Sequence, residues 1–483
     1  MPTKLGLIGI RRWPALGGVV LAMIWLVGCE GPAPIPLGPT DPTFPTARTE
    51  VRPIAAGPVL LRNDIVLRKV LELGVGHIRL ALNPADGQMY VLNPATGISR
   101  VTVGGSASVE SVIPLTDIVT DGVPSGLAFG PDGAMYVVAN RVVKRLKTQA
   151  LIRRGTLTAG QWTWETFAAT EPYPLSATPF DHLFNGIVVS ADGRWVYVNS
   201  GSRTDHGEVE NNSYNFPDAR EVALTAKIFR LPAGETNLVL PADEAALTAR
   251  GYIFASGIRN AYDPAFAPNG DLFAGDNGPD ADYPDELNWL RAGLHYGFPW
   301  RFGNFDNPQQ FPTYDSRDDK RLSQDFTAVR TGTYRIDYSF PPAPSTFTDP
   351  VQNLGPDAAL YRADDGRERN AAAESQAIYT FTPHRSPLGL VFATDAQFPS
   401  DLRGDDATVS AFILSWGAAG GTLSDVGQDL LHLRLTKTGD NYQAVTTQIA
   451  REFQNPIDAV LIENRLYVLD FSGNGAVWEL TFE

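Results

Sequence analysis

The stretch Gly126-Leu-Ala-Phe-Gly-Pro-Asp-Gly-Ala-Met-Tyr-Val137 decides the fold class of this chain. It consists of two apolar runs on either side of a Pro-Asp-Gly sequence. Aspartate and glycine tolerate the left-handed backbone conformations that tight hairpin turns require. The stretch therefore predicts two antiparallel strands joined by a tight turn.

The same pattern recurs along the chain and gives six units in all, the others being Leu80–Val91, Gly186–Val198, Pro264–Phe273 and, with weaker turns, Gly389–Phe392 and Ala459–Leu469. A unit of a few strands cannot bury its faces alone, so such units must stack around an axis. We therefore expect an all-β fold, a six-bladed β-propeller, over residues 58–483. A strand over Pro58–Leu71 is expected to pair into the last blade and close the ring. An array of β-sandwiches is the competing arrangement.

Composition excludes several classes of protein. The chain has 483 residues, 43% of them hydrophobic and 19% charged, which is enough apolar material for a core. The net charge is −15, and so acidic a chain repels phosphate backbones, which excludes nucleic acid as a main partner. The single cysteine excludes an internal disulfide and multi-cysteine metal sites. A segment at about residues 305–380 is rich in Pro, Asp and Arg and lacks periodicity, so we expect a long loop insertion at one mouth of the ring.

The N-terminus has the pattern of an export signal. A basic start containing Lys4 and Arg11 precedes an uncharged stretch over residues 13–28, which ends at Cys29. An apolar run of this length is short for a membrane-spanning helix and typical of a signal peptide. The ending Leu-Val-Gly-Cys29 resembles the bacterial lipobox, in which the signal is cut before the cysteine and the thiol is lipidated. We therefore predict a lipoprotein signal peptide over residues 1–28, with an ordinary anchor helix and a chance cysteine as the alternative.

Residues 29–57 follow with proline at a density that allows neither helix nor central strand. They are expected to form an extended tether between the lipidated Cys29 and the propeller. Several acyl chains on one residue would anchor the protein stably. The sequence thus predicts an exported cell-envelope lipoprotein, facing the periplasm or the cell surface and attached to the membrane only through its lipid anchor.

Two regions carry candidate functional residues. In the third unit, His182 precedes the Asp192-Gly193 turn at the entry to an inner strand, where a propeller opens toward its axial pocket. In the fourth unit four short motifs follow one another within about 40 residues, namely Gly257-Ile-Arg259-Asn260, Asp276-Asn-Gly278-Pro279, Asp285-Glu286-Leu-Asn288 and His295-Tyr296-Gly297-Phe-Pro299. On these motifs the chain resembles the glucose/sorbosone dehydrogenase family, including the soluble aldose sugar dehydrogenases. These proteins are six-bladed propellers that hold pyrroloquinoline quinone (PQQ) and Ca²⁺ at the mouth of the ring.

The resemblance implies a role for each matching residue. His182 corresponds to the general base, and imidazole is well suited to take a proton near neutral pH. Arg259 and Asn260 correspond to the pair that contacts the quinone oxygens, with Arg259 also stabilising developing charge. The remaining matches are His384 and Arg385 lining the cofactor pocket, the backbone carbonyls of Gly278 and Pro279 binding the Ca²⁺ under PQQ, and Glu286 with Tyr296 at a second Ca²⁺ site.

The chain also departs from the family pattern. Ser125 stands in a Val-Pro-Ser sequence where the family often has Gln-Gly, and Ser202 stands where many members have an aspartate that orients the base. Asn455 replaces an arginine, and the Ser-Trp-Gly-Ala sequence over residues 415–418 lacks its usual basic residue. PQQ is a tricarboxylate, so the loss of two cations is expected to weaken its binding.

The resemblance implies a quinoprotein sugar dehydrogenase. Such an enzyme would oxidise an aldose or related hydroxy-aldehyde by Ca²⁺-assisted hydride transfer to PQQ and pass the electrons to an exported acceptor. One alternative is a calcium-stabilised propeller that has lost PQQ and binds glycans or a protein partner. Another is a metal-dependent lactonase propeller, for which the sequence offers only scattered carboxylate and amide ligands.

Overall fold

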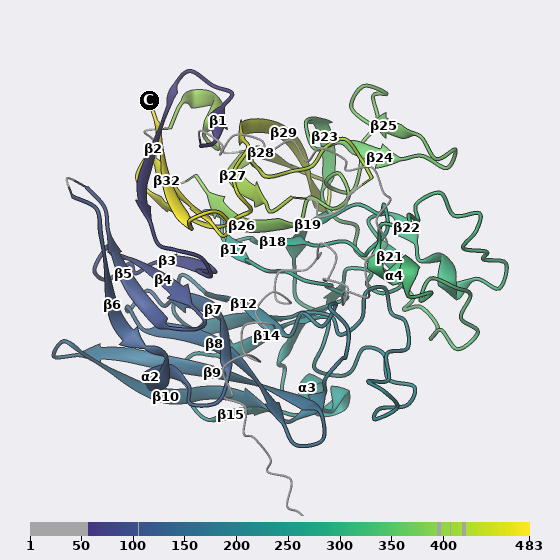
Figure 1. The fold of residues 1–483 in the computed structure, drawn as a ribbon, viewed down its shortest axis with the longest axis horizontal. Coiled ribbons are helices and arrows are strands. Elements are labelled where there is room, and N and C mark those ends of the chain that lie inside the picture. The colour runs from purple at the N-terminus through teal and green to yellow at the C-terminus, as the bar shows by residue number, and fades with distance from the viewer. Residues whose placement is uncertain (1–56, 105, 394–397, 406, 418–421) are drawn as a thin grey trace, which may run out of the picture.

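The computed structural model describes residues 57–104, 106–393, 398–405, 407–417 and 422–483. Its strands form six blades arranged in a ring, a six-bladed β-propeller (Figure 1), which confirms the predicted fold class. The predicted signal peptide, Cys29 and nearly all of the tether lie outside the described residues. Within the described ranges, no helix is both long and apolar enough to cross a membrane.

The first three blades follow one another along the chain. Blade one contains β3 (Arg79–Leu82), β4 (Met89–Asn93), β5 (Gly97–Thr102) and β6 (Ser108–Pro114). Blade two contains β7 (Val123–Phe129), β8 (Met135–Val143), β9 (Lys147–Thr158) and β10 (Gln161–Thr170), with β11 (Tyr173–Pro174) and β15 (Leu238–Leu240) at its edges. Blade three contains β12 (Phe184–Val189), β13 (Trp195–Ser200), β14 (Lys227–Pro232), β16 (Ile253–Ser256) and β20 (Leu294–His295).

The other three blades complete the ring. Blade four contains β17 (Ala265–Phe266), β18 (Leu272–Asp276) and β19 (Glu286–Leu290). Blade five contains β26 (Pro387–Phe392), β27 (Thr408–Ser415), β28 (Asp429–Thr438) and β29 (Asn441–Arg451), flanked by β1 (Val59–Leu60) and β23 (Gln352–Pro356). Blade six contains β30 (Pro456–Ile462), β31 (Arg465–Asp470), β32 (Ala476–Phe482) and β2 (Ile65–Glu72).

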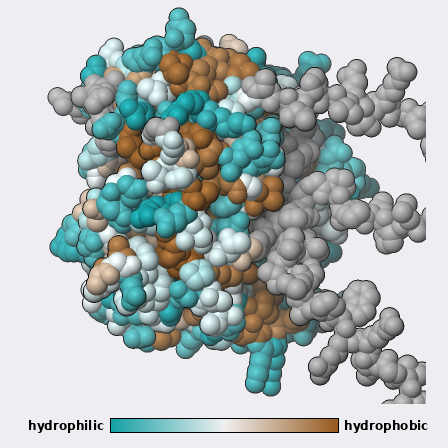
Figure 2. Space-filling view, turned by 60° about the vertical axis from the view of Figure 1, so that its left-hand side comes forward, coloured by the Kyte–Doolittle hydropathy of each residue, from teal (hydrophilic) through white to brown (hydrophobic). Residues whose placement is uncertain are grey.

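The ring is closed by a strand from the start of the described chain. Strand β2 pairs antiparallel with β32 near the C-terminus, with Leu67 opposite Leu480. This pairing confirms the expected closure and gives blade six its outer strand. On this side of the molecule β2 and β6 expose Val66 and Val109. The space-filling view shows hydrophobic areas there interrupted by hydrophilic ones (Figure 2).

Local turn chemistry and packing between blades explain the fold. At the stretch that predicted it, Gly133 has φ +81° and Asp132 Oδ1 accepts a hydrogen bond from the Ala134 amide. These are the features that a tight turn requires. Apolar side chains on the two faces of each blade pack against the neighbouring blades, with Val137 and Val198 fully buried. The apolar core therefore lies between the blades and leaves the ends of the inner strands to polar residues.

The expected insertion is mostly irregular. It carries β22 (Phe305–Asp306), paired with the preceding β21 (Arg301–Phe302), a short helix α4 (Thr327–Arg330) and the pair β24 (Leu360–Arg362) and β25 (Glu368–Asn370). Its apolar side chains, among them Ala328 and Tyr334, pack against Ala281 and Tyr283 of the loop between β18 and β19. We call the end of the ring at which the inner strands begin the mouth. The insertion covers the mouth end of blades three and four.

The only other α-helices in the described ranges are α2 (Leu115–Ile118) and α3 (Glu244–Ala249), together with the 3₁₀ turns η2 (Pro308–Gln310) and η3 (Ser400–Leu402).

Candidate functional site

His182 lies immediately before the inner strand of blade three and is 1% exposed. Its Nδ1 lies 3.2 Å from the hydroxyl oxygen of Ser202, and that hydroxyl donates its proton to the Thr204 carbonyl at 2.8 Å. Because the hydroxyl proton is already used, Nδ1 must be the donor in the His–Ser bond. The neutral ring then carries its proton on Nδ1 and presents Nε2 as an acceptor. Ser202 therefore holds the histidine in place of the aspartate that is frequent in the family.

The electrostatic surroundings keep this imidazole neutral. Burial, together with the nearby positive charge of Arg259, lowers the pKa of His182 to about 3. Desolvation disfavours the charged form of any histidine, and a neighbouring cation adds to the effect. At physiological pH the ring is therefore in the form that accepts a proton.

Arg259 and Asn260 lie on the loop that enters blade four and are joined to the His182 segment by hydrogen bonds. Their backbone amides donate to the two carboxylate oxygens of Asp276, at 2.9 and 2.5 Å. The Asn185 amide group donates both to the His182 carbonyl, at 3.3 Å, and to Asn260 Oδ1, at 2.8 Å. The structure thus brings together the three residues that the sequence nominated on two different blades.

The Asn260 amide nitrogen has no hydrogen-bond partner among the described residues, although it is buried. Leaving a buried donor unpaired costs about 1–3 kcal/mol. An acceptor oxygen placed against Asn260 Nδ2 would remove that cost, so the position suits a ligand carbonyl.

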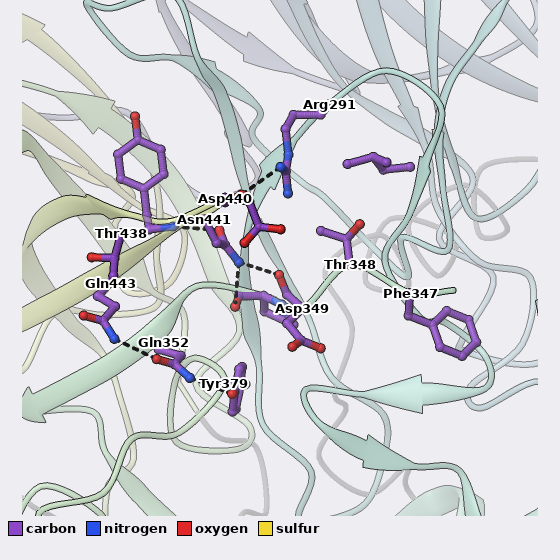
Figure 3. Close-up of a pocket in the computed structure, with 13 residues that line it drawn as sticks. Arg291, Phe347, Thr348, Asp349, Gln352, Tyr379, Thr438, Asp440, Asn441 and Gln443 are labelled. Carbon is purple, nitrogen blue, oxygen red and sulfur yellow. Dashed lines mark hydrogen bonds between the residues drawn. The ribbon is translucent and has the colours of Figure 1, made fainter. Parts of the chain in front are cut away.

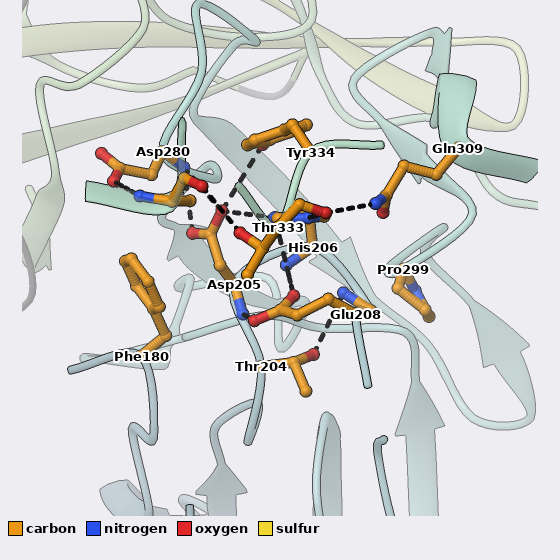
Figure 4. A network of polar contacts seen from close by, with 12 residues as sticks. Phe180, Thr204, Asp205, His206, Glu208, Asp280, Pro299, Gln309, Thr333 and Tyr334 are labelled. Carbon is orange, nitrogen blue, oxygen red and sulfur yellow. Dashed lines mark hydrogen bonds and ion pairs between the residues drawn. The ribbon is translucent and has the colours of Figure 1, made fainter. Parts of the chain in front are cut away.

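The Arg259 guanidinium is held by the loop of blade three. It donates to Asp205 Oδ1 at 2.7 Å, to the Asp205 carbonyl at 2.8 Å and to the Asn277 carbonyl at 3.2 Å. Asp205 also accepts from His206 Nδ1 at 2.7 Å (Figure 4). Against the effect of burial, the bond from His206 and the charge of Arg259 hold the pKa of Asp205 below its usual range. The charges of Glu208 and Asp205 likewise raise the pKa of His206, although burial opposes them.

The insertion completes this polar network, which Figure 4 shows from close by. The Tyr334 ring stacks on His206 at 3.8 Å between centroids, and the Tyr334 hydroxyl lies 3.4 Å from Asp205 Oδ2. The Thr333 carbonyl lies 3.4 Å from His206 Nε2. The sequence offers His206 as a rival to His182 near the same face, and the structure places it in this network. Tyr334 was not predicted, since no local pattern marks it.

The predicted calcium loop is compact. The Gly278 amide donates to Asp285 Oδ1 at 2.7 Å, and a side chain at Gly278 would come within 3.0 Å of the Pro284 carbonyl. The Pro279 carbonyl already accepts a hydrogen bond from the Ala281 amide at 2.8 Å. Among the described residues, no three His, Cys, Asp or Glu side chains converge as metal ligands. The predicted backbone ligands therefore stay a prediction.

Glu286 and Tyr296 are both buried, Glu286 on β19 of blade four and Tyr296 directly after β20 of blade three. Glu286 accepts from the Gly303 amide at 2.6 Å and from the Asn288 side chain at 2.9 Å. Burial and the charge of Asp276 raise the pKa of Glu286 well above its usual range. The Tyr296 hydroxyl donates to the Trp289 carbonyl at 2.5 Å. Their assignment to a second Ca²⁺ site also stays a prediction.

His384 and Arg385 have different surroundings. His384 Nε2 lies 3.0 Å from Asp282 Oδ1, which joins it to the loop of blade four. Arg385 is 1% exposed and forms ion pairs with Asp425 and Asp429, the latter at 2.5 Å. Two carboxylates balance this one guanidinium, so its charge offers little attraction to an acidic cofactor.

Comparisons with known proteins identify the family that the chain resembles. The family model described as Glucose / Sorbosone dehydrogenase matches residues 120–324, which include His182, Arg259, Asn260 and the predicted calcium residues but not His384 or Arg385. The chain is 27% identical to quinoprotein glucose dehydrogenase B of Acinetobacter calcoaceticus over 263 residues, which are 48% of this chain and 52% of that protein. The chain therefore spans about half the length of this curated relative. The resemblance to the glucose/sorbosone dehydrogenase family is thereby confirmed.

Solved structures show the same fold. The soluble aldose sugar dehydrogenase of Escherichia coli in its apo form gives a TM-score of 0.55 at 16% identity, over 87% of this chain and 100% of that one. The holo form of the PQQ domain of pyranose dehydrogenase from Coprinopsis cinerea gives 0.53 at 12% identity, over 88% and 97% of the two chains. At these identities the likeness establishes the propeller fold alone.

Proposed function

We propose that this protein is a PQQ-dependent sugar dehydrogenase that oxidises an aldose or related hydroxy-aldehyde. The observation that carries the proposal is His182, buried and neutral, with Ser202 fixing its Nδ1 proton beside Arg259 and the unpaired amide of Asn260. A fixed base next to a cation and an amide donor suits the removal of a hydroxyl proton while negative charge develops on a neighbouring oxygen.

The residues present fit the quinone end of PQQ. Asn260 Nδ2 is a buried donor that lacks an acceptor, and the adjacent Arg259 supplies positive charge. These two residues would hold a quinone oxygen. The charge of Arg385 is balanced by Asp425 and Asp429, so the carboxylates of PQQ depend on other groups. When bound, PQQ supplies an acceptor for the hydride that leaves the sugar carbon.

His182 is the residue that would accept the proton of the sugar hydroxyl. His182 Nε2 takes the proton of the sugar hydroxyl while Nδ1–H stays bonded to Ser202. The ring is 1% exposed, so bulk water does not compete for this position.

Calcium, the location and the electron acceptor belong to the same proposal. Ca²⁺ would be held by the backbone oxygens of Gly278 and Pro279, in a loop that also buries Asp276 and Asp285. There it would act as a Lewis acid. The lipobox-like ending at Cys29 supports a cell-envelope lipoprotein, from which electrons would pass to an exported acceptor.

The test uses the full chain loaded with Ca²⁺. PQQ is titrated while its absorbance is followed, and sugar-dependent reduction of a dye is then measured. His182→Gln should retain PQQ binding but lose about 10²–10⁴-fold in kcat, the usual contribution of a general base. His432→Gln is a matched control, since His432 is also buried and bonded to a serine, Ser410, at 2.8 Å in blade five. It should keep full turnover.

Two results would overturn the proposal. Turnover that survives in His182→Gln would show that His182 is not the general base. The absence of saturable PQQ binding at micromolar concentration would show that PQQ is not the cofactor. The second result would favour a propeller that binds glycans or a protein partner without catalysis.

A further inference from the structure

A cavity of about 420 Å³ lies between blades four and five (Figure 3). Arg291, just after β19, forms one wall, and the tip of the β28–β29 hairpin over residues 438–443 forms another. The insertion closes it with residues 347–352 and Tyr379. Its volume lies within the range of small-ligand sites, about 300–1,000 Å³.

Arg291 and the tip of the β28–β29 hairpin lie at the end of the blades opposite the candidate catalytic site, whereas the Tyr379 wall reaches back toward Asp285. Strands β18 and β19 pair from Asp276 with Glu286 at one end to Leu272 with Leu290 at the other. Asp276 binds the backbone of Arg259 at the mouth, whereas Arg291 follows Leu290. The cavity is therefore a separate site and not an extension of the mouth.

A chain of polar side chains along the wall presents both a donor and an acceptor. Gln443 Nε2 donates to Gln352 Oε1 at 2.8 Å, and Gln352 Nε2 donates to the Tyr379 hydroxyl at 2.6 Å (Figure 3). Because the Tyr379 oxygen accepts, its own proton is left to donate. At the other end Gln443 Oε1 is left as an acceptor. A ligand hydroxyl can serve as partner to either group, since it both donates and accepts.

The walls are fixed before any ligand arrives. Asn441 Nδ2 donates to the Asp349 carbonyl at 2.8 Å and ties the hairpin to the insertion. Arg291 donates to the Asp440 carbonyl at 2.8 Å and lies over the Trp289 ring at 4.2 Å. Its Nε is buried and has no partner among the described residues. Such a preformed wall loses little conformational entropy on binding, and the unpaired Nε gains a partner from a ligand oxygen.

The charges indicate a neutral ligand. The cavity lining contains two carboxylates, those of Asp349 and Asp440, and the positive charge of Arg291 offsets one of them. Asp349 also forms an ion pair at 3.0 Å with Arg301, which lies outside the lining. Amide groups and aromatic rings, including Tyr379 and Phe347, make up much of the remaining surface. Fixed amides, a cation and aromatic faces together suit a neutral ring that carries several hydroxyl groups. We propose that this cavity binds a saccharide unit, independently of the proposed dehydrogenase activity.

The test measures sugar binding by the full chain without PQQ. Glucose, maltose and cellobiose are titrated up to about 50 mM by calorimetry and by saturation-transfer NMR, which detect dissociation constants in the millimolar range. Tyr379→Phe and Gln443→Leu each remove one group and should weaken binding at least about fivefold, the loss of one net hydrogen bond of about 1 kcal/mol. Tyr214→Phe is the matched control, since Tyr214 is 86% exposed on another loop, and it should bind as the parent does.

His182→Gln distinguishes sugar binding at the mouth from sugar binding in this cavity. The variant should bind sugar in the cavity as tightly as the parent does. The proposal is refuted if none of the three sugars binds saturably, or if the two cavity variants bind as tightly as Tyr214→Phe does. Either result can occur with dehydrogenase turnover intact, so the two proposals fail independently.

Discussion

Ser202→Ala tests the assignment of the His182 tautomer more directly than a change at the histidine itself. The Ser202 hydroxyl is fully buried, accepts from His182 Nδ1 at 3.2 Å and donates to the Thr204 carbonyl at 2.8 Å. Alanine removes both bonds and leaves the buried Thr204 carbonyl without its side-chain donor, whereas the His182 ring keeps the backbone carbonyls of Ser202 and Phe180 nearby. An unpaired buried group costs about 1–3 kcal/mol, so the free energy of unfolding should fall by about 1–3 kcal/mol.

The effect on the proposed reaction is separate from the effect on stability. Without Ser202, the neutral ring of His182 is free to carry its proton on Nε2, the atom that must accept a proton. If the reactive tautomer falls to between a tenth and a hundredth of the population, kcat falls about 10–100-fold, or about 1.4–2.7 kcal/mol. PQQ affinity should change little, because the side-chain contacts of Arg259 and Asn260 do not involve the Ser202 hydroxyl.

Three measurements decide the outcome. Dye reduction gives kcat, urea unfolding gives stability, and ¹⁵N chemical shifts of the imidazole report which ring nitrogen carries the proton. Ser190→Ala is the control, since Ser190 is a buried serine at the other end of the same hairpin, bonded to Asp192 at 2.6 Å. It should lose stability but not kcat. The reasoning is wrong if the shifts place the proton on Nε2 in the parent protein, or if Ser202→Ala keeps full kcat.

Four further predictions follow from the described contacts. Burial and the charge of Arg259 lower the pKa of His182 to about 3. The pH–rate profile should therefore show no inflection from His182 near pH 6.5, and the rate should fall only below about pH 4. The same lowered pKa should destabilise the fold as the pH falls from about 6.5 toward 3, because the unfolded chain binds a proton at His182 in this range and the folded protein does not. Acid-unfolding curves of the parent and of His182→Gln would show the difference. Arg385→Met should lower the free energy of unfolding, measured in urea, by about 3–5 kcal/mol, because the carboxylates of Asp425 and Asp429 lose their ion-pair partner. The PQQ affinity of the folded protein should stay within about twofold of the parent value. Deleting residues 57–72 removes the outer strand of blade six and should abolish the single cooperative thermal transition seen by circular dichroism.

The parts of the molecule that sequence predicts well are those that local chemistry determines. Turns such as Asp132-Gly133 require particular residues at particular positions, so their recurrence revealed the number of blades. The closing strand β2 was predictable because a ring cannot leave its last blade incomplete. His182, Arg259 and Asn260 were nominated because their short motifs resemble those of the glucose/sorbosone dehydrogenase family.

Contacts between distant irregular segments were not predictable. Tyr334 reaches Asp205 across 129 residues, from an insertion without periodicity. The pairing of Arg385 with Asp429 depends on how the segment before β26 meets the start of β28 in blade five. Side chains of these types occur in many loops, and only the three-dimensional path of the chain selects the partners.

Neither of the two buried arginines offers an unbalanced positive charge to an acidic cofactor. Arg385 lies between two carboxylates, so its surroundings carry more negative than positive charge. Arg259 forms an ion pair with Asp205 at 2.7 Å, and its charge also acts on the buried carboxylates of Asp276 and Asp285. The group at this site that lacks a partner among the described residues is the amide nitrogen of Asn260. We therefore assign the contact with a ligand oxygen to Asn260, because that contact would satisfy a buried donor.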